Sequence, residues 1–346
     1  MRKVLIITPQ SDQALAVARY IKKYDKNCVL HGGLMPYESS HDLYHYDKIV
    51  KITDKNIFRY YDIVLPTGAI STHWMATQVG SFKVNGVKYS DKNLNYFKKI
   101  DLLASIEHMG VPIPKTYATV EAVEGPYPIF YKQKFEKGGG TRGVAYVRSD
   151  LEKLTDCNDL IFQEYIPGRT TYGVGFIIQN GEMIVTFQHQ ELLSYPLQGG
   201  SAVYLRRFYD ERLEKYTRCI VQGMGYDGWG LAEFKYCNKR KDFVFMEVNA
   251  KLWASIEFAF INNNKFLKYL LGINYQEKKV EAALFIDRLI ALGWKHILLN
   301  IHHLSNANII SYRRPSENLR ALVSGSIPLS VKSGLKALLS KTPEKK

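Results

Sequence analysis

The sequence predicts a protein of mixed α/β and α+β class, and three observations lead to this expectation. Short apolar runs alternate with helical patterns over roughly the first 88 residues, which favours an open α/β sheet. An acidic strand hairpin lies between residues 229 and 251. Beyond about residue 275 the pattern becomes helical and basic. A chain of 346 residues has room for two or three such modules.

The composition of the sequence excludes some classes of protein and indicates what kind of partner to expect. No run of about 18 apolar residues occurs, so a membrane-spanning helix is excluded, and the apolar run 4–7 is too short for a signal sequence. The four cysteines lack paired spacing, which argues against a disulfide framework or a zinc site and favours the reduced cytoplasm. The net charge of +14 suits an anionic partner, whether nucleotide, acidic glycan, nucleic acid or membrane surface.

The N-terminal region reads as alternating strands and helices. Strands are expected at 3–7, 28–30, 49–52 and 62–65, with a helix after the first of them. Loops at the carboxyl ends of parallel strands commonly bind ligands, which makes 8–12 and 67–71 candidates. Plain turn chemistry is the alternative for each residue in them.

The next region carries basic residues and glycines. A helix is expected from about Lys92 to Met109, ending at Gly110 before two prolines. A strand at 128–132 ends in a lysine, and the glycine-rich loop 136–143 follows it. Glycines allow backbone N–H groups to approach a phosphate closely. A flexible hairpin tip is the alternative reading of this loop.

Further strands lead to the acidic hairpin. One is expected at 160–166, and a hairpin at 173–178 and 183–189 turns through Asn180-Gly181. In the acidic hairpin, alternation places Glu233 of the first strand and Glu247 and Asn249 of the second on one face. Apolar neighbours predict that Glu247 is buried and therefore needs a partner. Two carboxylates and an amide oxygen are hard ligands that suit Mg²⁺ on phosphates, and a solvated face with incidental acids is the alternative.

The C-terminal region is predicted to form helices at 282–292 and 297–301, broken at Gly293. A tail with five lysines follows. A basic amphipathic tail can lie on an anionic membrane, or it can pack on its own domain with its lysines solvated.

Taken in order, the strand lysine, the glycine-rich loop, the Gln163–Ile166 strand and the stretch Met246–Lys251 resemble the ATP-grasp superfamily. The resemblance covers about residues 1–275, and it is greatest to the branch of carbamoyl phosphate synthase and the carboxylate–amine ligases of bacterial glycan biosynthesis. It implies a Rossmann-like pre-ATP-grasp domain at 1–88 and a two-lobed ATP-grasp domain at 89–275, with the lobes split near 160–168. A basic helical C-terminal extension at 276–346 would complete the chain.

The resemblance also implies a set of site residues. They are the Mg²⁺ ligands Glu233, Glu247 and Asn249, the phosphate lysines Lys99 and Lys132, the phosphate lid Gly138, Gly139, Gly140, Thr141 and Arg142, and the adenine hinge Gln163, Glu164, Tyr165 and Ile166. Two positions depart from the family pattern. Thr171 stands where an acid usually holds the ribose hydroxyls, and Lys251 replaces an arginine whose bidentate phosphate contact a lysine cannot make.

The function implied is an ATP- and Mg²⁺-dependent ligase that joins a carboxylate to an amine through an acyl phosphate and releases ADP. Lys251 is expected to neutralise phosphate charge, and Arg206 and Arg207 to grip the substrate carboxylate, unless they form a solvated face. Similar proteins act in surface polysaccharide or amino-acid conjugate synthesis, so an acidic sugar or amino acid is the expected acceptor.

Two other functions stay open. Thr171 and Lys251 would suit an ATP-binding pseudo-enzyme or regulatory module, and the charge alone would suit a basic adaptor. For the ligase we expect no nucleic acid partner and a cytoplasmic location, with peripheral contact to the inner face of the membrane and homodimer formation left open.

Overall fold

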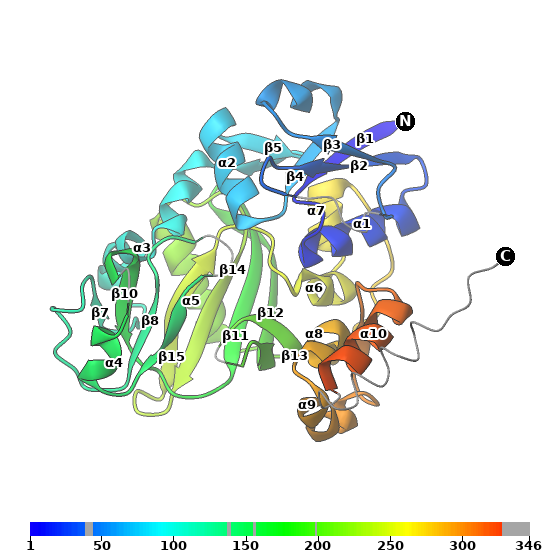
Figure 1. Ribbon diagram of the computed structural model, residues 1–346. Helices are drawn as coiled ribbons and strands as arrows, with labels where there is room; N and C mark the ends of the chain where they lie inside the picture. Colours follow the sequence, from blue (N-terminus) through cyan, green and yellow to red (C-terminus); the bar gives the residue numbers. More distant parts are fainter. Residues whose placement is uncertain (39–43, 137–139, 155–156, 198, 327–346) are drawn as a thin grey trace.

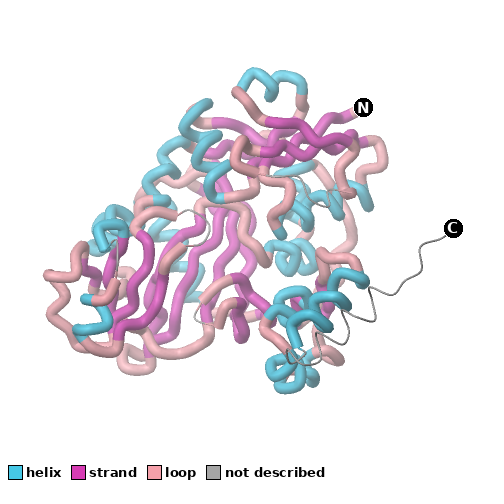
Figure 2. Tube along the Cα trace, viewed as in Figure 1, coloured by secondary structure: helices cyan, strands magenta, loops and turns pink. Residues whose placement is uncertain are grey.

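A computed structural model describes the chain except for residues 39–43, 137–139, 155–156, 198 and 327–346. Within the described residues the strands form three sheets and a separate two-stranded hairpin. Figures 1 and 2 show the N-terminal sheet above the large sheet, with the small sheet to the left, on the side of β15. The predicted mixture of α/β and α+β structure is confirmed.

The N-terminal domain is a parallel sheet with strand order β3-β2-β1-β4. Residues 4–7 of the central strand are fully buried, as expected when helices or other layers cover both faces of a parallel sheet. Its elements are β1 (Arg2–Ile7), α1 (Asp12–Tyr24), β2 (Cys28–Leu34), β3 (Lys48–Lys51), η1 (Lys55–Tyr60), β4 (Ile63–Pro66) and α2 (Ala69–Val79), followed by the hairpin β5 (Phe82–Val84) and β6 (Val87–Tyr89).

The small lobe is an antiparallel sheet with order β7-β10-β8-β9. Its elements, with the segment leading into it, are η2 (Asp91–Phe97), α3 (Lys99–Ile106), η3 (Glu107–Met109), β7 (Thr116–Tyr117), β8 (Ile129–Gln133), β9 (Arg142–Ala145), α4 (Arg148–Glu152), η4 (Cys157–Asp159) and β10 (Leu160–Glu164).

The expectation of one continuous helix over residues 92–109 is wrong. The chain is extended at Lys98, with φ −97° and ψ 95°, and forms an isolated bridge to Phe135. The backbone N–H of Lys99 also donates to the carbonyl of Lys134 at 2.8 Å. This pairing with a distant segment overrides local helix propensity and places Lys99 at the first position of α3.

The large lobe is a sheet with order β15-β14-β11-β12-β13-β16-β17, antiparallel except for its last pair. The predicted turn at Asn180-Gly181 is confirmed, since both residues have positive φ as the tight hairpin requires. The elements are β11 (Thr171–Gln179), β12 (Glu182–Tyr195), β13 (Ser201–Arg207), α5 (Glu211–Gly223), β14 (Gly228–Cys237), β15 (Asp242–Asn249), α6 (Ile256–Asn262) and α7 (Lys265–Leu271).

The C-terminal region is helical as expected, but it also extends the large sheet. Residues 282–285, expected to begin a helix, form β16 (Ala282–Phe285), which is buried and pairs with β13. An apolar run of this length suits a helix or a strand equally, and the open edge of β13 decides between them. The remaining elements are α8 (Ile286–Ala291), α9 (Trp294–Leu299), η5 (Ile301–His303), β17 (Asn308–Ile310) and α10 (Pro315–Ser326).

Arg288 of α8 joins the N-terminal domain to the large lobe. Its guanidinium donates to Asp12 at 2.6 and 3.1 Å, to the carbonyl of Ala254 at 2.8 Å and to the carbonyl of Ala202. It also lies 4.1 Å from the ring centroid of Phe285. A buried arginine is thus held by fixed partners from α1, β13 and the segment before α6.

Candidate functional site

The acidic hairpin has the register that its sequence predicts. Glu233 of β14 lies directly opposite Glu247 of β15, and Leu231 lies opposite Asn249. The amide nitrogen of Asn249 donates to Glu233 at 3.1 Å. The two carboxylates and the amide therefore converge on one face of the large sheet, as expected from strand alternation.

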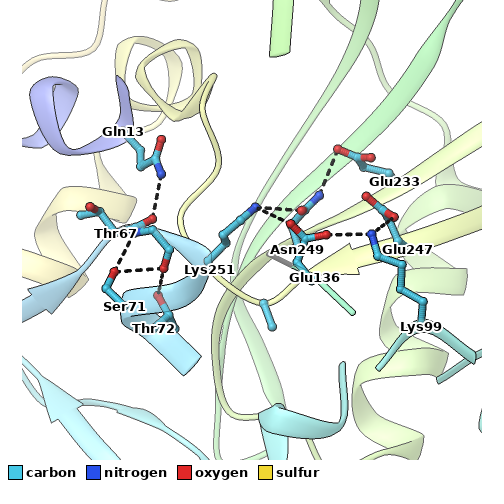
Figure 3. A network of polar contacts seen from close by, with 12 residues as sticks. Gln13, Thr67, Ser71, Thr72, Lys99, Glu136, Glu233, Glu247, Asn249 and Lys251 are labelled. Carbon is cyan, nitrogen blue, oxygen red and sulfur yellow. Dashed lines mark hydrogen bonds and ion pairs between the residues drawn. The ribbon is translucent and has the colours of Figure 1, made fainter. Parts of the chain in front are cut away.

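Three lysines from distant segments meet this face. Lys99 and Lys132 each donate to the same oxygen of Glu247 at 2.9 Å. Lys251 donates to the amide oxygen of Asn249 at 2.9 Å. Figure 3 shows Lys99, Glu247, Asn249 and Lys251 directed toward one another. The structure thus brings together the three lysines and three oxygen donors assigned from the sequence, from both lobes of the protein.

Glu136 is a fourth oxygen donor in this cluster, and no sequence motif assigned it a role. Its carboxylate accepts from Lys99 at 2.7 Å and lies 3.8 Å from the ammonium of Lys251. Its own backbone N–H donates to the carbonyl of Phe97 at 2.8 Å, which fixes the segment beside α3. The sequence feature that could have indicated a role for Glu136 is that it is the single acidic residue of the stretch 136–143.

The charges of the cluster set its pKa values. Burial acts to raise the pKa of Glu247, but Lys132 and Lys99 outweigh it and hold that pKa below its usual range. Burial acts to lower the pKa of Lys99, but Glu247 and Glu136 reverse the shift. Burial does lower the pKa of Lys132, whose contacts are one carboxylate and the carbonyl of Met246. At neutral pH Glu247 is therefore ionised, and it accepts hydrogen bonds from both lysine side chains.

Glu233 has the opposite shift. Burial, then the charge of Glu247 and then that of Glu191, raise the pKa of Glu233 to about 8. Lys99 and Lys132 donate to Glu247 and not to Glu233, so less positive charge offsets the burial of Glu233. A cation between the two carboxylates would supply it.

The oxygen atoms of Glu233, Glu247 and Asn249 fit a Mg²⁺ ion, because Glu233 lies buried beside Glu247 and a cation would balance the two carboxylates. In the described part of the chain no group of three or more His, Cys, Asp or Glu side chains is arranged to hold a metal, so protein oxygens would occupy only part of the coordination sphere. Mg²⁺ characteristically uses one or two carboxylates, with water and phosphate completing its octahedron. Asn249 turns its oxygen toward Lys251, so rotating the amide would be needed to present that oxygen beside Glu233.

The described residues of the predicted hinge and lid belong to β10, to the link that follows it and to the start of β9. Gln163 and Glu164 end β10, while Tyr165 and Ile166 begin the link to β11. The buried Ile166 packs with Val244, Cys237 and Met246, an apolar surface beside that link. Gly140 and Thr141 precede β9, which begins at Arg142, whereas Gly138 and Gly139 lie outside the described residues.

Thr171 begins β11 directly opposite Glu191, a second residue that sequence reasoning missed. Glu191 is 9% exposed, and its carboxylate lies 3.4 Å from Nε2 of the buried His189. His189 packs over Gly173, where an added Cβ would come within 2.6 Å of its ring. The face of the large sheet that carries Glu233 therefore has an acid, Glu191, on β12, although the acid expected at Thr171 of β11 is absent. Only the pairing of β11 with β12 shows that Glu191 lies on this face.

The two candidate substrate arginines have neighbours of their own on and beyond β13. Arg206 and Arg207 are exposed at the end of β13, and Arg207 pairs with Glu281 at 3.1 Å. Arg206 affects the pKa of His303, which places it toward η5. Their assignment to the substrate stays a prediction.

The loops at the carboxyl ends of β1 and β4 bind each other. The Thr67 hydroxyl donates to the carbonyl of Ile7 at 2.7 Å, and the Gln13 amide donates to the carbonyl of Thr67 at 2.8 Å. Ser71 caps the N-terminus of α2 through the N–H of Gly68 at 3.1 Å. Figure 3 draws this second polar group beside the lysine cluster. The Ser71–Gly68 contact is local turn chemistry, the alternative for this region, while the other two bonds hold the two loops together. Ligand binding by these loops stays a prediction.

Comparison with known proteins gives one family match and one relative that matches over a short stretch. Residues 97–255 match the family model described as "ATP-grasp domain". A "5-formaminoimidazole-4-carboxamide-1-(beta)-D-ribofuranosyl 5'-monophosphate synthetase" of Pyrobaculum aerophilum is 41% identical over 80 residues. That match covers 22% of this chain and 21% of the relative, so it extends over about a fifth of either protein.

Solved structures share the fold at low sequence identity. Biotin carboxylase of Campylobacter jejuni has a TM-score of 0.59 at 17% identity, covering 81% of this chain and 74% of that one. N5-carboxyaminoimidazole synthetase of Staphylococcus aureus, solved with ADP, has a TM-score of 0.61 at 12% identity, covering 80% and 79%. L-amino acid ligase of Bacillus licheniformis has a TM-score of 0.55 at 14% identity, covering 72% and 67%. Residues 97–255 therefore match an ATP-grasp domain, and these solved structures share the fold of the chain.

Proposed function

We propose that this protein is an ADP-forming carboxylate–amine ligase. The observation that carries the proposal is the meeting of Lys99, Lys132 and Lys251 with Glu233, Glu247 and Asn249 at one place between the small sheet and the large sheet. Three ammonium groups beside a pair of carboxylates form a site for a metal–triphosphate complex rather than for a neutral ligand.

In the proposed reaction an oxygen of the substrate carboxylate attacks the γ-phosphorus of ATP. The bond from the γ-phosphorus to the β,γ-bridging oxygen breaks, which gives an acyl phosphate and ADP. An amine then attacks the acyl carbon, loses a proton and expels phosphate, so that an amide forms. Mg²⁺ held by Glu233, Glu247 and Asn249 would neutralise charge on the terminal phosphates.

Three lysine side chains would also neutralise charge on the phosphates. Lys99 and Lys132 come from the small-lobe side and Lys251 follows the acidic hairpin, so they can approach the phosphates from different directions. Their side chains are only 10–12% exposed, and a charge that is shielded from water stabilises a developing negative charge more strongly. Positioning and neutralisation of charge are the main contributions a protein makes to phosphoryl transfer.

For the acceptor we propose an acidic sugar or an amino acid, in surface polysaccharide or amino-acid conjugate synthesis. The sequence resemblance supports this choice, and so does the net charge of +14, which favours anionic substrates. The structural relatives carry names that include an amino acid ligase and a carboxyaminoimidazole synthetase, so the fold is compatible with more than one acceptor.

The decisive experiment separates the two ways of cleaving ATP. The full chain is incubated with Mg²⁺, ATP and a panel of acidic sugars and amino acids, with hydroxylamine in place of the amine. We expect ADP by phosphorus NMR together with a hydroxamate of the accepted carboxylate. Release of AMP and pyrophosphate would refute the mechanism, and calorimetric binding of MgATP without turnover on any member would indicate an ATP-binding module instead.

A further inference from the structure

A cluster of large apolar side chains is exposed on α9 and η5. Its members, which we name the C-terminal apolar patch, are Trp294, Leu298, Leu299 and Ile301, with exposed fractions of 47%, 64%, 61% and 55%. Trp294 and Leu298 are four residues apart, and Ile301 lies three further on, so they follow one side of the helical segment. Single exposed apolar residues are ordinary, but a contiguous group marks an interaction surface.

The inner side of the same segment is already used for packing. Ile297 packs against a buried cluster that contains Val203, Leu284 and Leu289. His303 stacks on Tyr204 of β13, with ring centroids 3.7 Å apart. The segment is therefore seated on the large lobe through one side, and the C-terminal apolar patch is the side directed away from that core.

Exposed basic residues lie in the elements that carry the C-terminal apolar patch and in those next to them in the sequence or the sheet. Lys295 is exposed within α9, Arg206 lies toward His303, and Arg313, Arg314 and Arg320 are exposed before and on α10. From residue 286 to the C-terminus the sequence has ten Lys and Arg against three Asp and Glu, a net charge of +7. Half of the charge of the protein is thus concentrated in its last 61 residues.

We propose that the C-terminal apolar patch docks on the surface of an anionic lipid bilayer. Tryptophan and leucine side chains can enter the boundary between headgroups and acyl chains, while flanking basic residues are attracted to anionic lipids. In the part of the chain that the structure describes, the helices are too short or too polar to cross a bilayer, so the contact is peripheral.

The positive charge of this region also favours an anionic membrane over the other two partners that could cover the patch, a second copy of the protein and residues 327–346. A second copy would bring the same basic region against this one, and like charges oppose that contact. Residues 327–346 carry five lysines and one acid, so they too match the sign of the surroundings of the patch. An apolar face with a basic border instead complements a partner that is apolar inside and anionic at its surface.

Tryptophan fluorescence of the full chain gives a specific probe. Trp229 and Trp253 are buried and Trp74 is partly buried, whereas Trp294 is exposed. With vesicles of phosphatidylcholine and phosphatidylglycerol whose acyl chains are brominated, we expect quenching of Trp294 and co-sedimentation, both weaker at high salt and with phosphatidylcholine alone. The Trp294→Phe variant should lose the quenching but still co-sediment.

The triple variant Leu298→Ser, Leu299→Ser and Ile301→Ser should bind these vesicles at least tenfold more weakly, with thermal unfolding and ATP binding showing that it is folded. The matched control is Tyr60→Ser with Ile70→Ser, two exposed apolar residues of the N-terminal domain, and it should bind as the wild type does. The proposal is overturned if the triple variant still binds, or if only deletion of 327–346 abolishes binding. It is equally overturned if the wild type does not bind, or if light scattering shows a dimer that the triple variant dissociates.

Discussion

Two buried groups of charges in this protein differ in what holds them. Arg288 donates to two backbone carbonyls and to Asp12. The position of a backbone carbonyl is fixed by the fold, so a ligand cannot displace it. Lys99, Lys132 and Lys251 are instead held mainly by side-chain oxygens, which a phosphate oxygen can replace. The comparison suggests that burial of charge alone does not identify a binding site. The chemical nature of the partners distinguishes a structural contact from one open to ligand exchange.

The Glu247→Gln variant should show the largest functional effect. It removes the charge that binds both Lys99 and Lys132, and we expect ATP turnover to fall about 10²-fold or more. The substitution also leaves two buried lysines with less compensation, so thermal unfolding is measured beside turnover. Turnover within threefold of the wild type in a folded variant would remove Glu247 from the site.

Replacing Arg288 by Met should act on stability and spare the chemistry. Loss of one partner of a buried ion pair costs about 3 kcal/mol, and here the partly exposed Asp12 and two carbonyls lose their donor. Urea unfolding checks this, with turnover per folded molecule expected to stay within about twofold. The matched control is Arg218→Met, which breaks an exposed helical pair with Glu214 and should cost about 0.5 kcal/mol or less.

Mg²⁺ binding should depend on pH through Glu233. Its pKa is raised to about 8, so it is mostly protonated at pH 7, and the metal must displace that proton. Affinity for Mg²⁺ should therefore increase about tenfold per pH unit as the pH rises toward 8, and then level off. Calorimetric titrations with saturating ADP from pH 6 to 9 measure this, and a flat profile would contradict it. Glu233→Gln should bind Mg²⁺ weakly without the pH dependence.

The smallest expected effect concerns Glu136, whose carboxylate contacts Lys99 and Lys251 and would compete with bound phosphates for these two lysines. Glu136→Gln keeps the volume and an acceptor oxygen but removes a negative charge, so ATP and ADP should bind about fivefold more tightly, which is roughly 1 kcal/mol. Glu107→Gln, an exposed acid of η3, is the control and should leave both affinities unchanged. Weaker nucleotide binding by Glu136→Gln would show that Glu136 assists the ligand.

Sequence patterns predicted the parts of this molecule whose causes are local. The hairpins β11–β12 and β14–β15 follow from alternation and turn residues, and their register places Glu233 opposite Glu247. The break at Lys98 was missed because it depends on pairing with Phe135. Glu136 and Glu191 were missed for the same reason, since their neighbours are brought together by tertiary contacts and cross-strand register. The family match over residues 97–255 agrees with the predicted resemblance to ATP-grasp proteins, while the narrower subtype and the individual roles of the site residues stay predictions.

The position of β16 also affects how the protein unfolds. Because β16 pairs with β13 in the same sheet as the acidic hairpin, the C-terminal region cannot detach without exposing a hydrogen-bonding strand edge. Amide hydrogen exchange should therefore protect β13 and β16 to a similar degree, as members of one cooperative unit. A chain shortened before β16 would lose Arg288 and one edge of the large sheet, so the large sheet and the C-terminal region are expected to fold together.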